Sequence, residues 1–187
     1  MPNTGADAKS CAAVEYVRVQ SKNMENQLYF QLGKFVVIFQ SLEAQVTEIV
    51  LQIVNGNDEF VKILITQHEF SSLLKTTDVL FSRYVDERTI DDSEKNIFHK
   101  LIVDCNKLAE LRNTIVHSQY IDLVKGDEHI ALVRENSKLS GGKGARVEET
   151  EDLTKEDFEK YFDQLNVVIN ELEKFRLKII DWNDPCE

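Results

Sequence analysis

Apolar residues recur every three or four positions over most of the chain, the spacing that lines them up along one side of an α-helix. The first such repeat ends at NGND, residues 55–58, because Asn and Gly favour a turn. The next segment, DEFVKILI, is expected to form a short helical turn. Thr154 and Asp157 have the spacing of a capping box, which marks the start of a helix. The pattern predicts four main helices, over about Asn23–Val54, His68–Tyr84, Ser93–His117 and Thr154–Ile179.

Between the third and fourth helices the repeat changes from 3.6 residues to two. The sequences YIDLV and HIALVRE flank KGDE, which predicts a β-hairpin over about residues 119–135. The polar, glycine-rich residues 136–152 are expected to form a flexible loop, and residues 1–22 a loose tail. The predicted fold class is all-α: one helical domain over about residues 23–182, with four main helices and a hairpin inserted before the last.

Composition narrows the classes of function. With 187 residues, 42% of them hydrophobic, the chain can bury one sizeable core. Its net charge of −11 argues against a protein that binds nucleic acid over a broad surface, since such binding depends on many Lys and Arg contacts to phosphate. The sequence has neither a signal-like start nor an uninterrupted apolar run of membrane-spanning length, so we expect a cytoplasmic protein without a membrane partner.

No metal site or cofactor is expected from the sequence. The three cysteines, Cys11, Cys105 and Cys186, are far apart and form no C-x-x-C pair. This spacing suggests neither a zinc site nor a disulfide framework, and the cysteines are expected to be free thiols.

One charged residue interrupts the apolar face of the third predicted helix. At about 100° per residue, Arg112 falls about 60° from Ile97, within the arc of the inward-facing leucines. An arginine keeps its proton, so on a buried face it needs a carboxylate partner or a bound anion. Glu43 lies within the apolar stripe of the first predicted helix and is a candidate partner. The sequence leaves open whether Arg112 forms a core ion pair with Glu43 or binds an anionic ligand.

The residues around Arg112 resemble a known motif. RNTIVH, with Arg112, Asn113 and His117, is similar to the R-x4-6-H motif of the HEPN superfamily, in which a polar residue often follows the arginine. The resemblance implies a helical bundle that often dimerises with its motif helices close together, and in many members a metal-independent endoribonuclease. It implies that His117 acts as acid and base on a ribose 2′-hydroxyl and that Arg112 holds the phosphate. Asn113 would orient either the imidazole of His117 or the phosphate.

Two hypotheses follow from the resemblance. The first is an endoribonuclease of the toxin or defence type that acts as a homodimer on RNA. The alternative is a non-catalytic HEPN-like module that keeps Arg112 paired with Glu43 and binds a protein partner or a nucleotide. Some HEPN toxins carry H-x-Y, whose tyrosine is modified by a nucleotidyltransferase antitoxin. Tyr120 lies one position later than that motif requires, so an antitoxin is a possible partner but this modification is not predicted.

Overall fold

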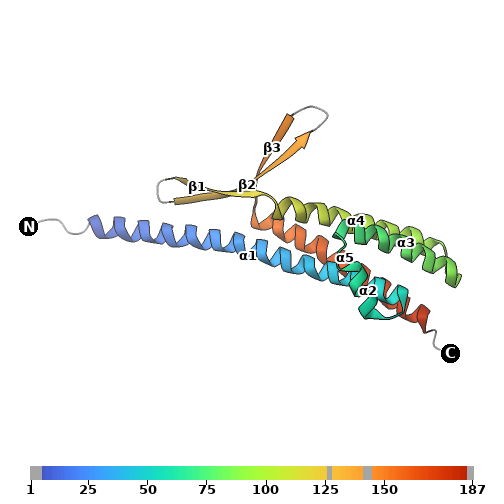
Figure 1. The fold of residues 1–187 in the computed structure, drawn as a ribbon. Helices are drawn as coiled ribbons and strands as arrows, with labels where there is room; N and C mark the ends of the chain where they lie inside the picture. The colour runs from blue at the N-terminus through green and yellow to red at the C-terminus, as the bar shows by residue number, and fades with distance from the viewer. Residues whose placement is uncertain (1–5, 126–127, 141–144, 185–187) are drawn as a thin grey trace, which may run out of the picture. The chain divides into compact units, whose positions relative to one another are not determined.

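The protein is described by a computed structural model that covers the backbone of residues 6–125, 128–140 and 145–184. Side chains are described over residues 28–121, 133–135 and 153–184. The described elements are the helices α1 (Ala6–Val54), α2 (Asp58–Ile65), α3 (Phe70–Arg88), α4 (Ser93–Val116) and α5 (Lys155–Asn183), and the strands β1 (Gln119–Lys125), β2 (Glu128–Ser140) and β3 (Ala145–Asp152) (Figure 1). The all-α prediction, with antiparallel strands inserted before the last helix, is confirmed.

The chain divides into two compact units. Unit 1 comprises Met1–Phe35 and Thr114–Lys160, and unit 2 comprises Val36–Asn113 and Tyr161–Glu187. Unit 1 therefore contains the three strands, and unit 2 contains α2, α3 and most of α4 and α5.

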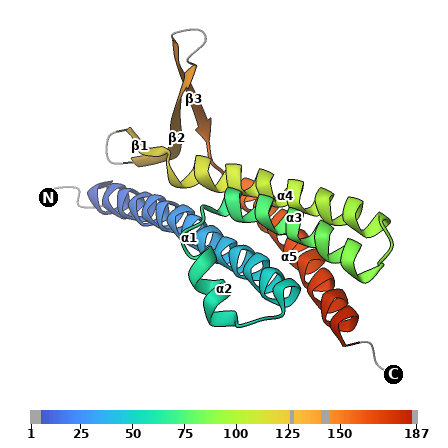
Figure 2. The same cartoon turned by 45° about the vertical axis from the view of Figure 1, so that its right-hand side comes forward.

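Unit 2 has a core of aromatic and aliphatic side chains from four helices. The ring of Phe81 on α3 stacks on Phe98 of α4, with centroids 4.0 Å apart, and meets Phe175 of α5 edge-on at 5.6 Å. Figures 1 and 2 show these three helices side by side. The last part of α1 also belongs to this group of helices. The carbonyl of Gln52 on α1 accepts a hydrogen bond from the side chain of Asn183 on α5 at 2.9 Å. The inward side chains have the three-and-four spacing seen in the sequence.

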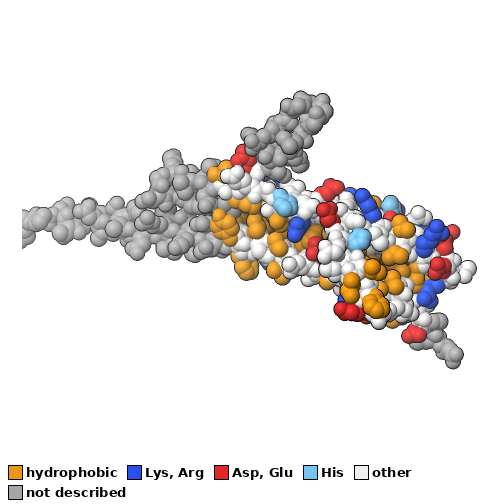
Figure 3. All heavy atoms as spheres, in the orientation of Figure 1, with side chains coloured by type: hydrophobic (Ala, Val, Ile, Leu, Met, Phe, Trp, Pro, Cys, Tyr) orange, Lys and Arg blue, Asp and Glu red, His pale blue; other side chains and the backbone are white. Residues whose placement is uncertain are grey.

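The short helix α2 connects α1 to α3 (Figure 2). Asn57 caps it, since its side-chain oxygen accepts hydrogen bonds from the backbone N–H groups of Glu59 and Phe60 at 3.1 and 3.3 Å. None of its residues is buried, and its three large apolar side chains, Phe60, Ile63 and Leu64, are exposed. Figure 3 shows apolar side chains gathered in the region of this helix. The expected short helical turn is confirmed, but it contributes little to the core.

In the part of the chain that the structure describes, one helical stretch is long and apolar enough to cross a membrane. It is Leu28–Val54, with a mean hydropathy of 1.3. Within unit 2 its side chains Phe39, Leu42 and Val46 are buried. A helix that packs in a protein core has the same composition, so the stretch is only a weak indication of a membrane span.

Unit 1 contains an antiparallel sheet of three strands in the order β1-β2-β3. Lys125 pairs with Glu128 at the end of the first hairpin, which agrees with the predicted position of its turn; residues 126–127 lie outside the described part. The register shifts between Leu123 and Val124, as at a β-bulge. The predicted hairpin before the last helix is confirmed.

The predicted flexible loop over residues 136–152 is wrong. Strand β2 continues to Ser140 and pairs with β3, from Val133 opposite Asp152 to Ser140 opposite Ala145. The glycine-rich sequence GGKG, residues 141–144, therefore connects two strands. Both flanking sequences are rich in polar residues, so they lack the apolar alternation by which a half-buried strand is recognised.

The predicted loose tail over residues 1–22 is also wrong from Ala6 onward, because α1 begins there and continues without interruption to Val54. Residues 1–5 lie outside the described part. Between residues 6 and 32 the sequence has no Pro or Gly and is rich in Ala, Glu, Lys and Gln, which favour helix. This stretch lacks apolar residues at regular helical spacing, so it has no continuous side to pack against a core. A sequence of this kind can still form a helix.

The capping box at the start of α5 is confirmed. The backbone N–H of Thr154 donates to the Asp157 carboxylate at 3.2 Å, and the N–H of Asp157 donates to the Thr154 hydroxyl oxygen at 3.3 Å. These reciprocal bonds satisfy two donors that the first turn of a helix leaves without intrahelical partners.

We predict that Phe81→Ala destabilises the protein by about 3–5 kcal/mol, because it leaves a cavity among the buried rings of Phe98 and Phe175. Phe60→Ala is the matched control: this side chain is 68% exposed, so its loss should change stability by less than about 0.5 kcal/mol. Urea unfolding followed by circular dichroism measures both. Equal losses in the two variants would contradict this description of the core.

Candidate functional site

Helix α4 carries the arginine and asparagine of the motif. Arg112 is half-buried, one turn after the buried residues Leu108 and Ala109, and Asn113 next to it is exposed. Both belong to unit 2. The expectation that the apolar face of this helix contains a charged side chain is therefore confirmed.

The guanidinium group of Arg112 has an incomplete set of partners. Its Nη1 donates a hydrogen bond to the side-chain oxygen of Asn113 at 3.2 Å. Its central carbon lies 5.9 Å from the ring centroid of Phe39 on α1, within cation–π range. Its Nε is buried and has no hydrogen-bond partner in the described part of the chain. Among the described residues, Arg112 therefore has one neutral hydrogen-bond acceptor, Asn113, and at least one N–H group without a partner. It also keeps its positive charge.

Glu43 does not form the ion pair with Arg112 that the alternative hypothesis expected. Among the described residues, no salt bridge within 4.0 Å joins them. Burial raises the pKa of the half-buried Glu43 carboxyl above its ordinary value, and the Arg112 charge lowers it by a smaller amount. The two groups attract each other at longer range, and this attraction does not compensate the carboxylate for the water it has lost.

His117 directly follows the last residue of α4 and belongs to unit 1, where its side chain is exposed. Two neighbouring hydroxyl groups satisfy carbonyls at the end of that helix. Ser118 donates to the carbonyl of Thr114, and Tyr120 donates to the carbonyl of Ile115 at 2.7 Å. Tyr120 therefore has a structural role in ending the helix.

The thiol of Cys105 is free and buried in unit 2. Burial raises the pKa of this thiol to about 12, so at neutral pH it stays protonated and is a poor nucleophile. The side chains described contain no group of three or more His, Cys, Asp or Glu residues placed to hold a metal ion.

Phe39 is the site residue that the sequence analysis missed. It lies near Arg112 only because α1 packs against α4, and its position in an ordinary apolar stripe carries no signal of that contact.

Comparisons with protein-family models, with curated proteins and with solved structures find no match for this chain. The resemblance to the HEPN superfamily therefore depends on the motif RNTIVH and on the helical context.

We predict that Glu43→Gln becomes more stable relative to the wild type as the pH rises from 4 to 7. A carboxyl whose pKa is raised on folding stabilises the folded state at pH values below its ordinary pKa of 4.5. This stabilisation is lost as the pH rises through the raised pKa that the carboxyl has in the folded state. The glutamine variant cannot ionise at this position, so its stability does not fall for this reason as the pH rises. Urea unfolding at both pH values measures the difference.

Glu87→Gln, at an exposed position on α3, is the control and should show no such trend. A direct ion pair between Glu43 and Arg112 would reverse the sign and make Glu43→Gln less stable at pH 7, which would contradict the geometry described above.

Proposed function

We propose that the protein is a cytoplasmic, metal-independent endoribonuclease of the toxin or defence type, acting through Arg112, Asn113 and His117. The observation that carries the proposal is the state of Arg112. It is half-buried, no carboxylate within 4.0 Å pairs with it among the described residues, and its Nε has no hydrogen-bond partner there. Such an arginine is suited to bind an anion, and a phosphodiester accepts its paired N–H groups well.

The proposed chemistry needs one proton carrier and one charge stabiliser. His117 takes the proton from the ribose 2′-hydroxyl as that oxygen attacks the adjacent phosphorus. The bond between phosphorus and the 5′ oxygen breaks, and the imidazolium returns its proton to the leaving oxygen. The products are a 2′,3′-cyclic phosphate and a 5′-hydroxyl. Arg112 stabilises the negative charge that builds on the phosphate oxygens, and Asn113 orients the arginine through the hydrogen bond they share.

A homodimer is part of this proposal. The resemblance implies that two motif helices lie close together, so each subunit would add an arginine and a histidine to one RNA-binding site shared by the dimer. A chain with a net charge of −11 needs such local concentration of positive charge to hold RNA.

The test is cleavage of a mixed RNA substrate by the purified chain in excess EDTA. We expect the wild type to cleave and to leave cyclic phosphate ends. His117→Ala should lower the rate about 10²–10⁴-fold, as expected for loss of a general base. Arg112→Ala should lower it about 10²–10³-fold, through lost stabilisation of charge. Asn113→Ala should have a smaller effect, because it only orients.

Two exposed residues outside the motif provide matched controls, His99 on α4 and Arg83 on α3. Their alanine variants should cleave like the wild type. Folding is checked by circular dichroism and association by sedimentation. If wild type and variants are equally inactive while the wild type is folded and dimeric, the endoribonuclease proposal fails.

A further inference from the structure

A groove of about 650 Å³ lies between α4 and α5 in unit 2. Its floor includes the buried side chains Leu108 and Val168, with Leu111 beside them. Val167 on its rim is 62% exposed, although it is large and apolar. This volume falls within the range of roughly 300–1,000 Å³ that ligand sites occupy. The groove is therefore an apolar surface that no described residue covers.

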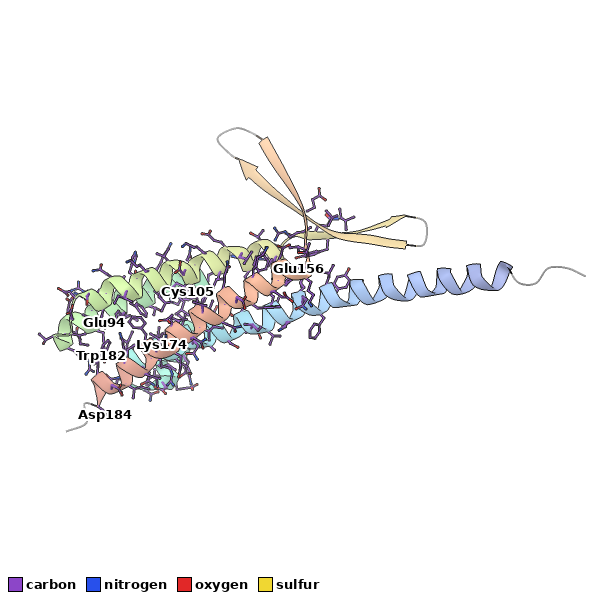
Figure 4. The ribbon with its side chains drawn as sticks, turned by 180° about the vertical axis from the view of Figure 1, so that it is seen from behind. Glu94, Cys105, Glu156, Lys174, Trp182 and Asp184 are labelled. Carbon is purple, nitrogen blue, oxygen red and sulfur yellow. The ribbon has the colours of Figure 1, made fainter. Side chains whose placement is uncertain are left out.

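The length of the groove along α4 matches two turns of an approaching helix. Figure 4 shows α4 and α5 side by side, and the salt bridge from Lys178 of α5 to Glu94 of α4, at 2.8 Å, joins them at the end away from the groove. Along α4 the lining runs from Asp104 to Leu111. This is two helical turns, about 10 Å at 1.5 Å per residue. Side chains at positions i, i+4 and i+7 of an approaching helix span the same length.

The charge on the rim favours a basic occupant. Asp104 and Asp163 provide two carboxylates and Lys107 provides one cation. The Lys107 ammonium is held by Asp104 at 2.7 Å, whereas Asp163 is exposed and makes no salt bridge with any described residue. One negative charge is therefore left over beside the apolar floor, on a chain that is itself strongly acidic.

We propose that the groove between α4 and α5 binds an amphipathic helix of a partner protein, with its apolar side chains against Leu108, Leu111 and Val168 and a Lys or Arg beside Asp163. The groove lies within unit 2, and its lining residues include none of Arg112, Asn113 and His117. Binding of the helix therefore does not require the proposed nuclease activity.

The probe is a fluorescein-labelled synthetic helix of about 18 residues, long enough to be helical in water, with Leu at i, i+4 and i+7 and Lys at its flanks. Fluorescence anisotropy with the full chain measures its Kd. Val167→Glu should weaken binding at least about tenfold, since it brings a charge to the apolar contact. Asp163→Lys should shift the preference toward a companion peptide with Glu in place of Lys.

Val79→Glu is the matched control, because Val79 on α3 is 63% exposed and does not line the groove. It should bind the peptide like the wild type, and Arg112→Ala should do the same, which separates this inference from the nuclease proposal. All four positions carry exposed or half-buried side chains, and circular dichroism checks that each variant is folded.

Three outcomes would overturn the inference. The first is that the Lys-flanked helix shows no measurable binding, and the second is that Val167→Glu and Val79→Glu weaken peptide binding equally. The third is that Val167→Glu abolishes the chain's self-association while the wild type binds no peptide. The last outcome would assign the groove to a second copy of the chain.

Discussion

The contact between Phe81 and Phe98 fixes the rotation of α4 about its axis, and the environment of the candidate site follows from that rotation. Phe98 is fully buried against α3 and α5, so its side of α4 faces the core of unit 2. Arg112 lies 14 residues later along the same helix, about four turns, and returns to nearly the same side. The aromatic packing therefore brings a permanently charged side chain into a partly desolvated position, beside Phe39, whatever its role there.

This position has an energetic cost that the described residues offset only in part, through the Asn113 hydrogen bond and the Phe39 ring. Among the residues that the structure describes, the Nε of Arg112 lacks a hydrogen-bond partner, and burial raises the pKa of Glu43 more than the Arg112 charge lowers it. In a core ion pair both charges would be satisfied, and each would depend on the other for stability. Here the arginine keeps the electrostatic capacity to attract an anion, at some expense to the free energy of folding. Strain of this kind in a folded chain is common where a ligand completes the set of interactions.

Much of the fold could be predicted from the sequence because the core imposes a regular period. Buried residues such as Leu74 and Leu172 mark their helices by spacing alone, and Thr154 with Asp157 marks a helix start by chemistry. Strand β3 and the first part of α1 have no regular apolar period, so the pattern of apolar residues could not predict them. The candidate site residues Arg112, Asn113 and His117 could be predicted from the motif, and Glu43 from its place in the apolar stripe of α1. The distance between Glu43 and Arg112 and the groove beside Val167 depend on how helices pack, which a single sequence does not encode locally.

Helix α2 shows how unevenly stability is distributed within unit 2. It is eight residues long, buries none of them and begins at the Asn57 cap. A segment this short is marginal without packing, so it can open and close while the aromatic core stays folded. Its backbone amides would then exchange with solvent through local opening, long before those of α3 and α4 exchange through global unfolding. Unit 2 thus combines an aromatic core that opens only on global unfolding with a short helix that opens on its own.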